Sequence, residues 1–338
     1  MKLLSIAIPA YNSEDYLARC LDSVSVEVDE RLDLIIVDDG SKDRTAEIAA
    51  EYVERYPQIF RYVKKENGGH GSAVNRGLQE AVGLWYYVLD SDDRLDFDNL
   101  KRVLNRLERF VAEGTVYDLY LVNYIYDKIG EKPKAISYAD HLPVSEGFNW
   151  TSMRRLGTAT FLTMHSMIYR SDLLRSIDFE LPEHCFYVDN LLAYQPLTSV
   201  RSIFYDDLDL YYYFIGRDDQ SVSMENLIKR IDQQIRVTKL MVESEDPYAE
   251  AIHRKLRAYM LSYVSMMMTI CTVHLRMTGK EEDKQKAREL WSWLKSKNRR
   301  IYRYCVMHPL SSPYIMSAMS AKTIRTGYKF AQKVFKFN

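Results

Sequence analysis

The first hundred residues of the chain alternate between short apolar runs and longer amphipathic stretches. Apolar runs of four to six residues predict buried strands. Between them, apolar side chains recur every three or four positions, as on one face of a helix. Strands that are apolar throughout favour parallel pairing with both faces covered. The strands expected here are Leu4–Pro9, Leu32–Val37, Phe60–Val63 and Trp85–Leu89.

The helices between these strands predict an α/β fold with a mostly parallel sheet and helices on both of its faces. Their expected ranges are Glu14–Val24, Arg44–Tyr56, Ser72–Ala81 and Phe97–Glu113. Weaker strand patterns follow at Leu119–Tyr126, Phe161–Tyr169 and Asp206–Phe214, with a loop over Lys128–Thr151. From Asn226 the pattern is helical almost to the end. We therefore expect an α/β domain over residues 1–224 and a helical region over residues 225–338.

Each of the first four strands leads into a polar, loop-forming segment. These segments read PAYN, DDGS, ENGGHG and DSDD in order. Because parallel strands end at the same edge of a sheet, and open α/β sheets bind ligands at that edge, we expect the four segments to form one site.

The last segment carries three carboxylates, Asp90, Asp92 and Asp93, within four positions. Charges so close repel one another, and a divalent cation relieves that repulsion. Hard oxygen ligands suit Mg²⁺ or Mn²⁺, which commonly bridge carboxylates to a substrate's phosphates. The alternative interpretation is a solvated, Asp-rich turn.

Composition limits the class of protein. A chain of 338 residues with 47% hydrophobic residues has room for two globular domains. The four cysteines lie far apart, which argues against a zinc site or a disulfide framework and fits a reducing, cytoplasmic compartment. The apolar start of the chain is too short for a signal peptide. The longest apolar stretch, Tyr259–Val273, is shorter than the roughly 20 residues that span a bilayer, so no transmembrane helix is expected.

The charge of the chain is unevenly distributed. Residues 295–338 hold ten Lys or Arg and no Asp or Glu, although the whole chain carries a net charge of −1. Projected on a helix, residues 321–338 place an apolar stripe beside a basic one, as in helices that lie in a membrane interface. A terminal helix that packs on its own domain explains the pattern equally well. No nucleic-acid partner is expected.

Three nucleotide-binding classes are disfavoured. A dinucleotide-binding domain carries G-x-G-x-x-G after its first strand, where this chain has Pro9-Ala10-Tyr11-Asn12. A nucleotidyltransferase also needs a Gly-rich phosphate loop at that place. No Walker A sequence is present.

Taken together, the motifs resemble those of family 2 glycosyltransferases, the inverting enzymes of the GT-A fold. The close match runs through SIAIPAYNSEDYLARCLDSV, LDLIIVDDGSKDRT, ENGGHGSAVNRGL and WYYVLDSDDRL. A weaker match continues through FYVDNLLAY and YYYFIGRDDQSVS to Ser223. The helical remainder lies outside the resemblance.

The resemblance implies a nucleotide-diphosphate sugar as donor, with UDP-sugar expected. Tyr11 would pack against the base, and Asp39 would accept a hydrogen bond from it. Asp92, with Asp90, would bind the metal. The residues implied in donor binding are Pro9, Ala10, Tyr11, Asn12, Asp39, Asn67, Gly68, Gly69, Asp90, Asp93 and Arg217.

The resemblance also implies a catalytic base, and Asp189 is the candidate. The family commonly has Glu-Asp here, and this chain has Val188-Asp189, which leaves a helix-capping role as the competing interpretation. Arg217 would contact the diphosphate or form a surface salt bridge. His165 would face the metal or the pyrophosphate, although a buried core histidine is the preferred interpretation.

The function implied is metal-dependent transfer of a sugar to a glycan or lipid-linked acceptor in polysaccharide synthesis, at the inner face of the membrane. The alternative is a catalytically silent subunit that binds sugar nucleotides and scaffolds a membrane assembly.

Overall fold

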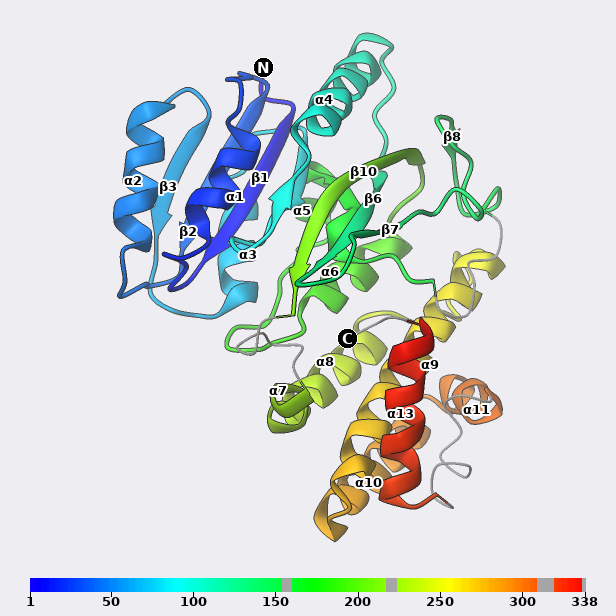
Figure 1. Ribbon diagram of the computed structural model, residues 1–338. Helices are drawn as coiled ribbons and strands as arrows, with labels where there is room; N and C mark the ends of the chain where they lie inside the picture. The colour runs from blue at the N-terminus through cyan, green and yellow to red at the C-terminus, as the bar shows by residue number, and fades with distance from the viewer. Residues whose placement is uncertain (154–159, 217–223, 309–318, 336–338) are drawn as a thin grey trace. The chain divides into compact units, whose positions relative to one another are not determined.

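The computed structural model describes residues 1–153, 160–216, 224–308 and 319–335. The chain divides into two compact units, Met1–Gly216 and Arg217–Asn338. The first unit is built from a sheet and helices, and the second is helical (Figure 1). This confirms the expected fold class.

Ten strands of the described residues form one sheet, whose main path runs β3-β2-β1-β4-β9-β6-β10-β5. The pairs β1–β2, β2–β3, β1–β4 and β6–β10 are parallel, and β9 pairs antiparallel with both β4 and β6. The strands are β1 (Leu4–Ala10), β2 (Leu32–Asp38), β3 (Phe60–Lys64), β4 (Trp85–Val88), β5 (Arg94–Leu95), β6 (Leu119–Lys128), β7 (Lys134–Ile136), β8 (Gly147–Phe148), β9 (Met167–Arg170) and β10 (Ile203–Ile215).

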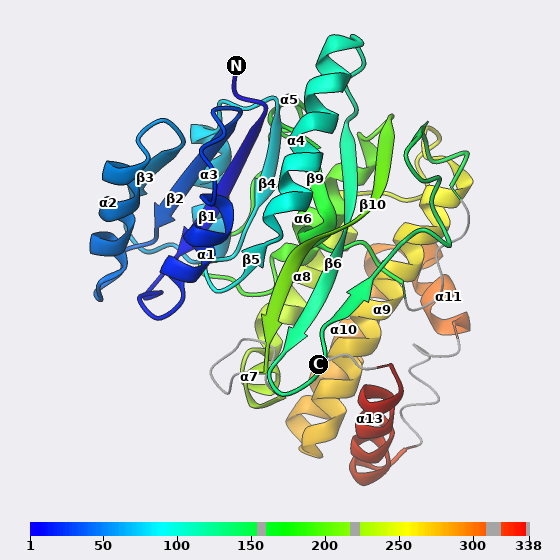
Figure 2. The same cartoon turned by 45° about the horizontal axis from the view of Figure 1, so that its top comes forward.

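Helices cover both faces of this sheet. α1, α2 and α4 lie on one face, and α3, α5 and α6 lie on the other (Figure 2). This is what right-handed crossovers between parallel strands produce when the chain reverses direction between β3 and β4. The helices are α1 (Leu17–Val24), α2 (Thr45–Arg55), α3 (His70–Glu80), α4 (Phe97–Ala112), α5 (Ser171–Ser176) and α6 (Asp189–Tyr194).

The core of this unit follows the expected apolar runs. Every residue of β1, β2 and β4 is buried, because helices cover both faces of these strands. α4 buries one apolar stripe and begins at Asp96, whose carboxylate accepts a hydrogen bond from Asn99 N. The strands thus form a rigid base whose carboxyl ends present the polar segments.

Two local expectations were wrong. The segment 128–151, expected to be a loop, contains the short strands β7 and β8, whose few residues give no clear alternation. The expected strand 161–169 is a 3₁₀ turn over Met164–Ser166 followed by β9. A short apolar run of this kind cannot be told from a strand by its pattern alone, and only its last part, from Met167, pairs in the sheet.

The second unit is a set of helices. They are α7 (Met224–Lys229), α8 (Ile231–Ser244), α9 (Arg254–Thr278), α10 (Glu281–Lys297), α11 (Arg299–Met307) and α13 (Ala321–Phe335). In the described part of the chain, α9 alone is long and apolar enough to cross a membrane, and 67% of its most apolar stretch is buried. That burial is typical of the core helix of a folded unit.

α13 begins the segment that was expected to be basic and amphipathic. Ile324 is 6% exposed, and the ring of Tyr328 lies 5.5 Å from the ring of His274 in α9. Arg325 Nε donates to the carbonyl of Met277 at 2.6 Å. The first half of the apolar stripe is therefore used for packing within this unit.

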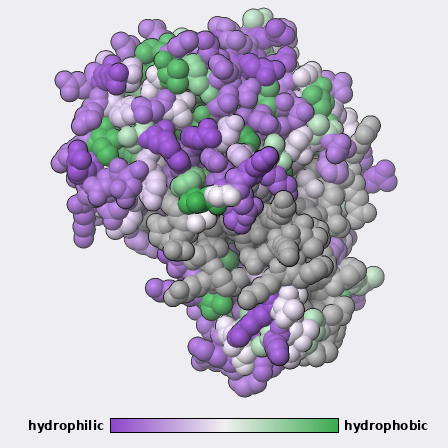
Figure 3. Space-filling view, viewed as in Figure 1, coloured by the Kyte–Doolittle hydropathy of each residue, from purple (hydrophilic) through white to green (hydrophobic). Residues whose placement is uncertain are grey.

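The face of the molecule shown in Figure 3 has hydrophilic and hydrophobic residues mixed over its described part. Larger exposed hydrophobic side chains, such as Val26, Val82 and Phe186, come from separate segments. Scattered apolar residues of this kind are normal on a protein surface.

Candidate active site

The polar ends of the four N-terminal strands meet at one edge of the sheet. After β1, Asn12 N donates to Ser41 Oγ in the segment after β2, at 3.0 Å. Ser13 Oγ lies 2.8 Å from Ser91 Oγ, just beyond β4. Segments far apart in sequence thus share hydrogen bonds, as their positions at strand ends predicted.

Asp39 organises the Gly-rich turn that follows β3. This residue is 2% exposed, and its carboxylate accepts hydrogen bonds from Gly68 N at 2.9 Å and Gly69 N at 2.7 Å. Lys65 Nζ lies 2.8 Å from the same carboxylate, and Asn67 Nδ2 donates to the Asp39 carbonyl. Asp39 thereby fixes the backbone of a turn that was expected to approach the nucleotide.

The residues expected to line the nucleoside differ in exposure. Pro9 and Ala10 are buried in β1, whereas Tyr11 is 51% exposed. Asn12 has a positive φ of 48°, and its side chain accepts a hydrogen bond from Lys42 N. Tyr11 therefore presents an open aromatic face at this edge.

Asp90 pairs with a histidine that sequence reasoning missed. His70 Nε2 lies 2.8 Å from Asp90 Oδ1, and both side chains are about one-quarter to one-third exposed, at 31% and 23%. Burial works to lower the pKa of His70, but the charges of Asp90, Asp189 and Asp92 outweigh it and raise that pKa. Burial works to raise the pKa of Asp90, but His70 and then His165 lower it.

The signal for His70 was present in the sequence. His70 is the first residue of α3 and directly follows the turn after β3, so it stands at the same sheet edge as Asp90. A titratable residue at a strand end is a candidate site residue.

Asp92 and Asp93 have different surroundings. Arg19 Nη2 donates to the backbone carbonyl of Asp92 at 2.7 Å. Asp93 is fully buried and accepts from Tyr211 OH at 2.6 Å and Phe214 N at 2.7 Å. Burial, then the charges of Asp92 and Asp90, raises the pKa of Asp93 well above its usual range. The three acids thus repel one another, and this set of oxygen donors fits a divalent cation.

His165 lies closer to this chemistry than expected. Asp90, Asp93 and His165 each place one ligand atom within 4.8 Å of the others. Burial lowers the pKa of His165 to about 4, so its imidazole is neutral. Its ring stacks on that of Tyr213 at 4.5 Å, and its buried Nδ1 has no hydrogen-bond partner in the described residues. A neutral imidazole of this kind can act as a ligand of a transition metal.

Asp189 is the first residue of α6. Burial raises the pKa of its carboxyl, although the charge of His70 works to lower it and that of Asp90 raises it further. The charges of His70 and Asp90 therefore both act on the Asp189 carboxyl. Val188, which replaces the usual acid, is 1% exposed and packs towards Gly71 of α3. A charged side chain at position 188 would not suit that buried place.

The loop before Asp189 is fastened to the Gly-rich turn. His184 N donates to the Gly68 carbonyl at 2.6 Å, and Ser72 Oγ donates to Glu183 at 2.8 Å. His184 and Tyr187 both have positive φ, which is uncommon for residues with side chains and tends to occur at functional sites. These bonds connect the loop that leads to Asp189 with the turn after β3. Arg217 lies outside the described residues.

Similarity to known proteins shows the family and the fold of the chain. A model of the family described as Glycosyl transferase family 2 matches residues 5–177. Two relatives with 24% identity are the glycosyltransferase GlyA of Streptococcus pneumoniae and the putative glycosyltransferase EpsH of Bacillus subtilis. The match covers 64% of this chain and 31% of GlyA, and 80% of this chain and 76% of EpsH. A chondroitin synthase of Escherichia coli is 31% identical over 48% of this chain and 22% of its own length.

Solved structures share the fold. S. aureus TarS 1-349 in complex with UDP-GlcNAc superposes with a TM-score of 0.65 and 18% identity, covering 97% of this chain and 92% of that one. The mannosyltransferase PcManGT of Pyrobaculum calidifontis, in complex with GDP-Man and Mn²⁺, superposes with a TM-score of 0.54 and 13% identity. The match covers 90% of this chain and 84% of that one. The fold is GT-A, as expected. With its motifs at one sheet edge and a family match over half of its length, the chain belongs to glycosyltransferase family 2.

Proposed function

We propose that this chain transfers a sugar, with inversion, from a nucleotide-diphosphate sugar to a hydroxyl of a glycan or lipid-linked acceptor. The observation that carries the proposal is Asp189, a half-buried residue at the start of α6 whose carboxyl has a raised pKa and is influenced by the charges of His70 and Asp90. A base of raised pKa near a nucleotide-binding edge suits deprotonation of an acceptor. UDP-sugar is the donor we expect, and TarS, whose fold this chain shares, has been solved with UDP-GlcNAc.

The donor would lie across the strand ends. Tyr11 offers an exposed ring for the base, and Asp39 holds the turn at Gly68 and Gly69 so that backbone approaches the nucleotide. Asn67 lies beside them. Pro9, Ala10 and Asn12 shape the first of these segments, and Arg217 is proposed to contact the diphosphate through its guanidinium fork.

The carboxylates would hold Mg²⁺ or Mn²⁺. Asp92 and Asp90 are the proposed ligands, and Asp90 also belongs to the group with Asp93 and His165. Asp93 already accepts two protein hydrogen bonds, which suits it to support the site rather than to bind the ion. When bound, the cation would offset negative charge on the departing diphosphate.

In the proposed reaction, Asp189 takes the proton of the acceptor hydroxyl. The freed oxygen forms a bond to the anomeric carbon while the bond from that carbon to the diphosphate oxygen breaks. Attack opposite the leaving group inverts the configuration. The bonding electrons leave with the diphosphate, and the proton stays on the Asp189 carboxyl until solvent removes it.

A silent scaffold that only binds sugar nucleotides is the second candidate. The observation that favours it is Val188, which removes one acid from the usual pair. Because Asp189 keeps the essential carboxyl, we place catalysis first.

The test is a panel of nucleotide sugars assayed for metal-dependent release of the nucleoside diphosphate, with wild type, Asp92→Asn and Asp189→Asn. We expect release by wild type and a loss of at least about a hundredfold in either variant. Asp189→Asn should still bind UDP, because its carboxyl faces the acceptor. An inactive wild type that binds UDP would instead support the scaffold.

The acceptor and the cellular place are also proposals. The relatives include polysaccharide synthases, which favours a cell-surface polysaccharide as product. Docking at the inner face of the membrane would use the basic side of α13, since Lys322 and Arg325 are exposed while Ile324 is buried. Such a contact would be electrostatic and would not insert the apolar stripe.

A further inference from the structure

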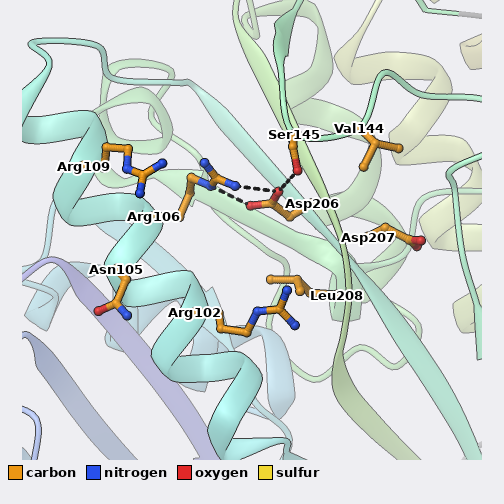
Figure 4. Close-up of a pocket in the computed structure, with 9 residues that line it drawn as sticks. All are labelled: Arg102, Asn105, Arg106, Arg109, Val144, Ser145, Asp206, Asp207 and Leu208. Carbon is orange, nitrogen blue, oxygen red and sulfur yellow. Dashed lines mark hydrogen bonds and ion pairs between the residues drawn. The ribbon is translucent and has the colours of Figure 1, made fainter.

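A polar cavity of about 290 Å³ lies apart from the strand-end residues of the candidate active site. It is formed by α4, by the segment before β8 and by the start of β10 (Figure 4). None of the residues assigned to the donor, the metal or the base lines it. It therefore needs an explanation of its own.

Three arginines from one face of α4 line this cavity. Arg102, Arg106 and Arg109 are spaced four and three residues apart, which places them side by side on the helix. In Figure 4 the guanidinium groups of Arg102 and Arg109 lie on either side of Arg106. Like charges at this spacing repel one another, so the arrangement is costly unless anions offset it.

Only the middle arginine is neutralised by the described part of the protein. Arg106 donates to both carboxylate oxygens of Asp206, at 2.9 and 3.2 Å. Asp206 is 5% exposed and also accepts from Tyr120 OH at 2.8 Å and Ser145 Oγ at 2.6 Å. Its charge and hydrogen-bonding capacity are therefore committed to Arg106 and to its own surroundings.

The two outer arginines keep their charge available. Both side chains are exposed; Arg102 makes a hydrogen bond to Asn99 at 3.2 Å, and the guanidinium of Arg109 has no ion pair among the described residues. Asp207 also lines the cavity, but in Figure 4 it points away from the arginines, and its carboxylate accepts from Asn123 and Ser137. The cavity thus presents two open guanidinium groups.

The shape of β10 helps to make the cavity. The register with β6 shifts between Tyr205 and Asp209, so the pairing is irregular at the cavity. Neighbouring residues go to opposite sides here, as in any strand, Asp206 to Arg106 and Asp207 to Asn123. Asn105 and Ser145 add neutral hydrogen-bonding groups at the wall.

We propose that this cavity binds a phosphorylated saccharide, with its phosphate on Arg102 and Arg109 and its hydroxyls towards the Asn105 amide. Guanidinium forks match phosphate oxygens, and amide groups match sugar hydroxyls. The volume is at the small end for ligand sites, which suits one sugar phosphate unit. The unit is either free or part of a phosphate-bearing chain. This proposal stands independently of the proposed transfer.

The test is calorimetric titration of the whole protein with glucose 1-phosphate, in the presence of saturating UDP and Mn²⁺ to fill the donor site. We expect wild type to bind and the double variant Arg102→Ala/Arg109→Ala to bind at least about tenfold more weakly. The control, Arg55→Ala/Lys101→Ala, removes two exposed or half-exposed cations from outside the cavity and should bind like wild type.

Two further ligands separate the parts of the proposal. Inorganic phosphate should bind more weakly than glucose 1-phosphate, because it lacks the hydroxyls. Equal affinities would remove the saccharide from the proposal. Equal binding of glucose 1-phosphate by the double variant and wild type, or no binding by wild type, would overturn it. The proposal would also be overturned if the double variant bound glucose 1-phosphate like wild type but no longer bound vesicles of phosphatidylglycerol. That result would assign the arginines to a lipid surface.

Discussion

The Nε2 atom of His70 lies 2.8 Å from Oδ1 of Asp90, joining the start of α3 to the end of β4. Each member of the pair favours the charged form of the other, since the pKa of His70 is raised and that of Asp90 is lowered. The pair thus connects the turn held by Asp39 to the acidic segment. From the sequence, the Gly-rich turn and the acidic segment were expected to contact the donor separately.

The first prediction concerns the stability of the metal-free protein. The contribution of His70 is complete below the usual histidine pKa of about 6.5 and is lost as pH rises through its higher folded value. The contribution of Asp90 is complete above about 3.9 and is lost as pH falls through its lower folded value. Wild type should therefore have a higher free energy of unfolding than His70→Gln, and the difference should be largest between about pH 4 and 6.5. Urea denaturation at a series of pH values measures it.

His141→Gln provides the control, because this histidine lies outside the site in the loop between β7 and β8. The difference in unfolding free energy between His141→Gln and wild type should not peak between about pH 4 and 6.5. A difference for His70→Gln that stays constant from about pH 4 to 9 would contradict an ion pair with Asp90.

Asp93 should show the opposite dependence on pH. Its pKa is raised by burial and by the neighbouring acids, so the folded state holds its proton longer than the unfolded state does. The wild-type fold therefore loses stability as pH rises from about 3.9 towards the folded pKa. Asp93→Asn, which cannot ionise, should gain in unfolding free energy relative to wild type over that range. A relative loss as pH rises would show that the ionised Asp93 is stabilised.

The sequence predicted the frame of the site well because strand ends are local features. Apolar runs located β1, β2, β3 and β4. The rule that parallel strands end at one edge of a sheet then predicted Asp39 and Asp90 at the same edge. What could not be predicted are contacts that depend on side-chain packing. The bond of His184 N to Gly68 O, for example, joins residues separated by most of the domain.

The insertion of β9 shows a second limit. β9 lies between β4 and β6 and runs antiparallel to both, so a strand late in the sequence occupies the middle of the sheet. Periodicity gives no information on strand order. His165, just before β9, reaches the acidic segment through this insertion, and for that reason the sequence favoured a core role for it over a place beside the metal site.

Addition of a divalent cation should stabilise the protein. A bound ion offsets repulsion among Asp90, Asp92 and Asp93, and a ligand that binds only the folded state raises the melting temperature. We expect Mn²⁺ to raise the melting temperature of wild type, and EDTA to reverse the change. Asp90→Asn and Asp92→Asn should each reduce the shift, whereas Asp172→Asn, with a side chain 81% exposed, should keep it. An unchanged shift in both site variants would contradict the proposed ligands.

Gly71 should tolerate no side chain. A Cβ there would lie 2.7 Å from the Pro182 carbonyl and 3.0 Å from Leu181 Cβ, so the loop that leads to Asp189 would have to move. We expect Gly71→Ala to cost about 1–3 kcal/mol in unfolding free energy and to reduce sugar transfer.

Gly327→Ala is the matched control for Gly71→Ala, since Gly327 is also helical and a Cβ there meets no atom of the described residues within 4 Å. It should instead stabilise the protein by up to about 1 kcal/mol, because alanine favours helix. Denaturation curves for both variants provide the measurement. Equal effects of the two substitutions would show that the contact of Gly71 with the 181–182 segment carries no constraint.

The basic side of α13 gives the last prediction. Because Ile324 is buried and Arg325 bonds the end of α9, membrane contact through this helix would depend on charge and not on inserted apolar side chains. The protein should therefore float with vesicles containing anionic lipid and be released by about 0.5 M salt, and it should not float with neutral vesicles. A variant with Lys322, Lys329 and Lys333 changed to Gln should float less while keeping its fold. Equal flotation of this variant and wild type would assign α13 to packing alone.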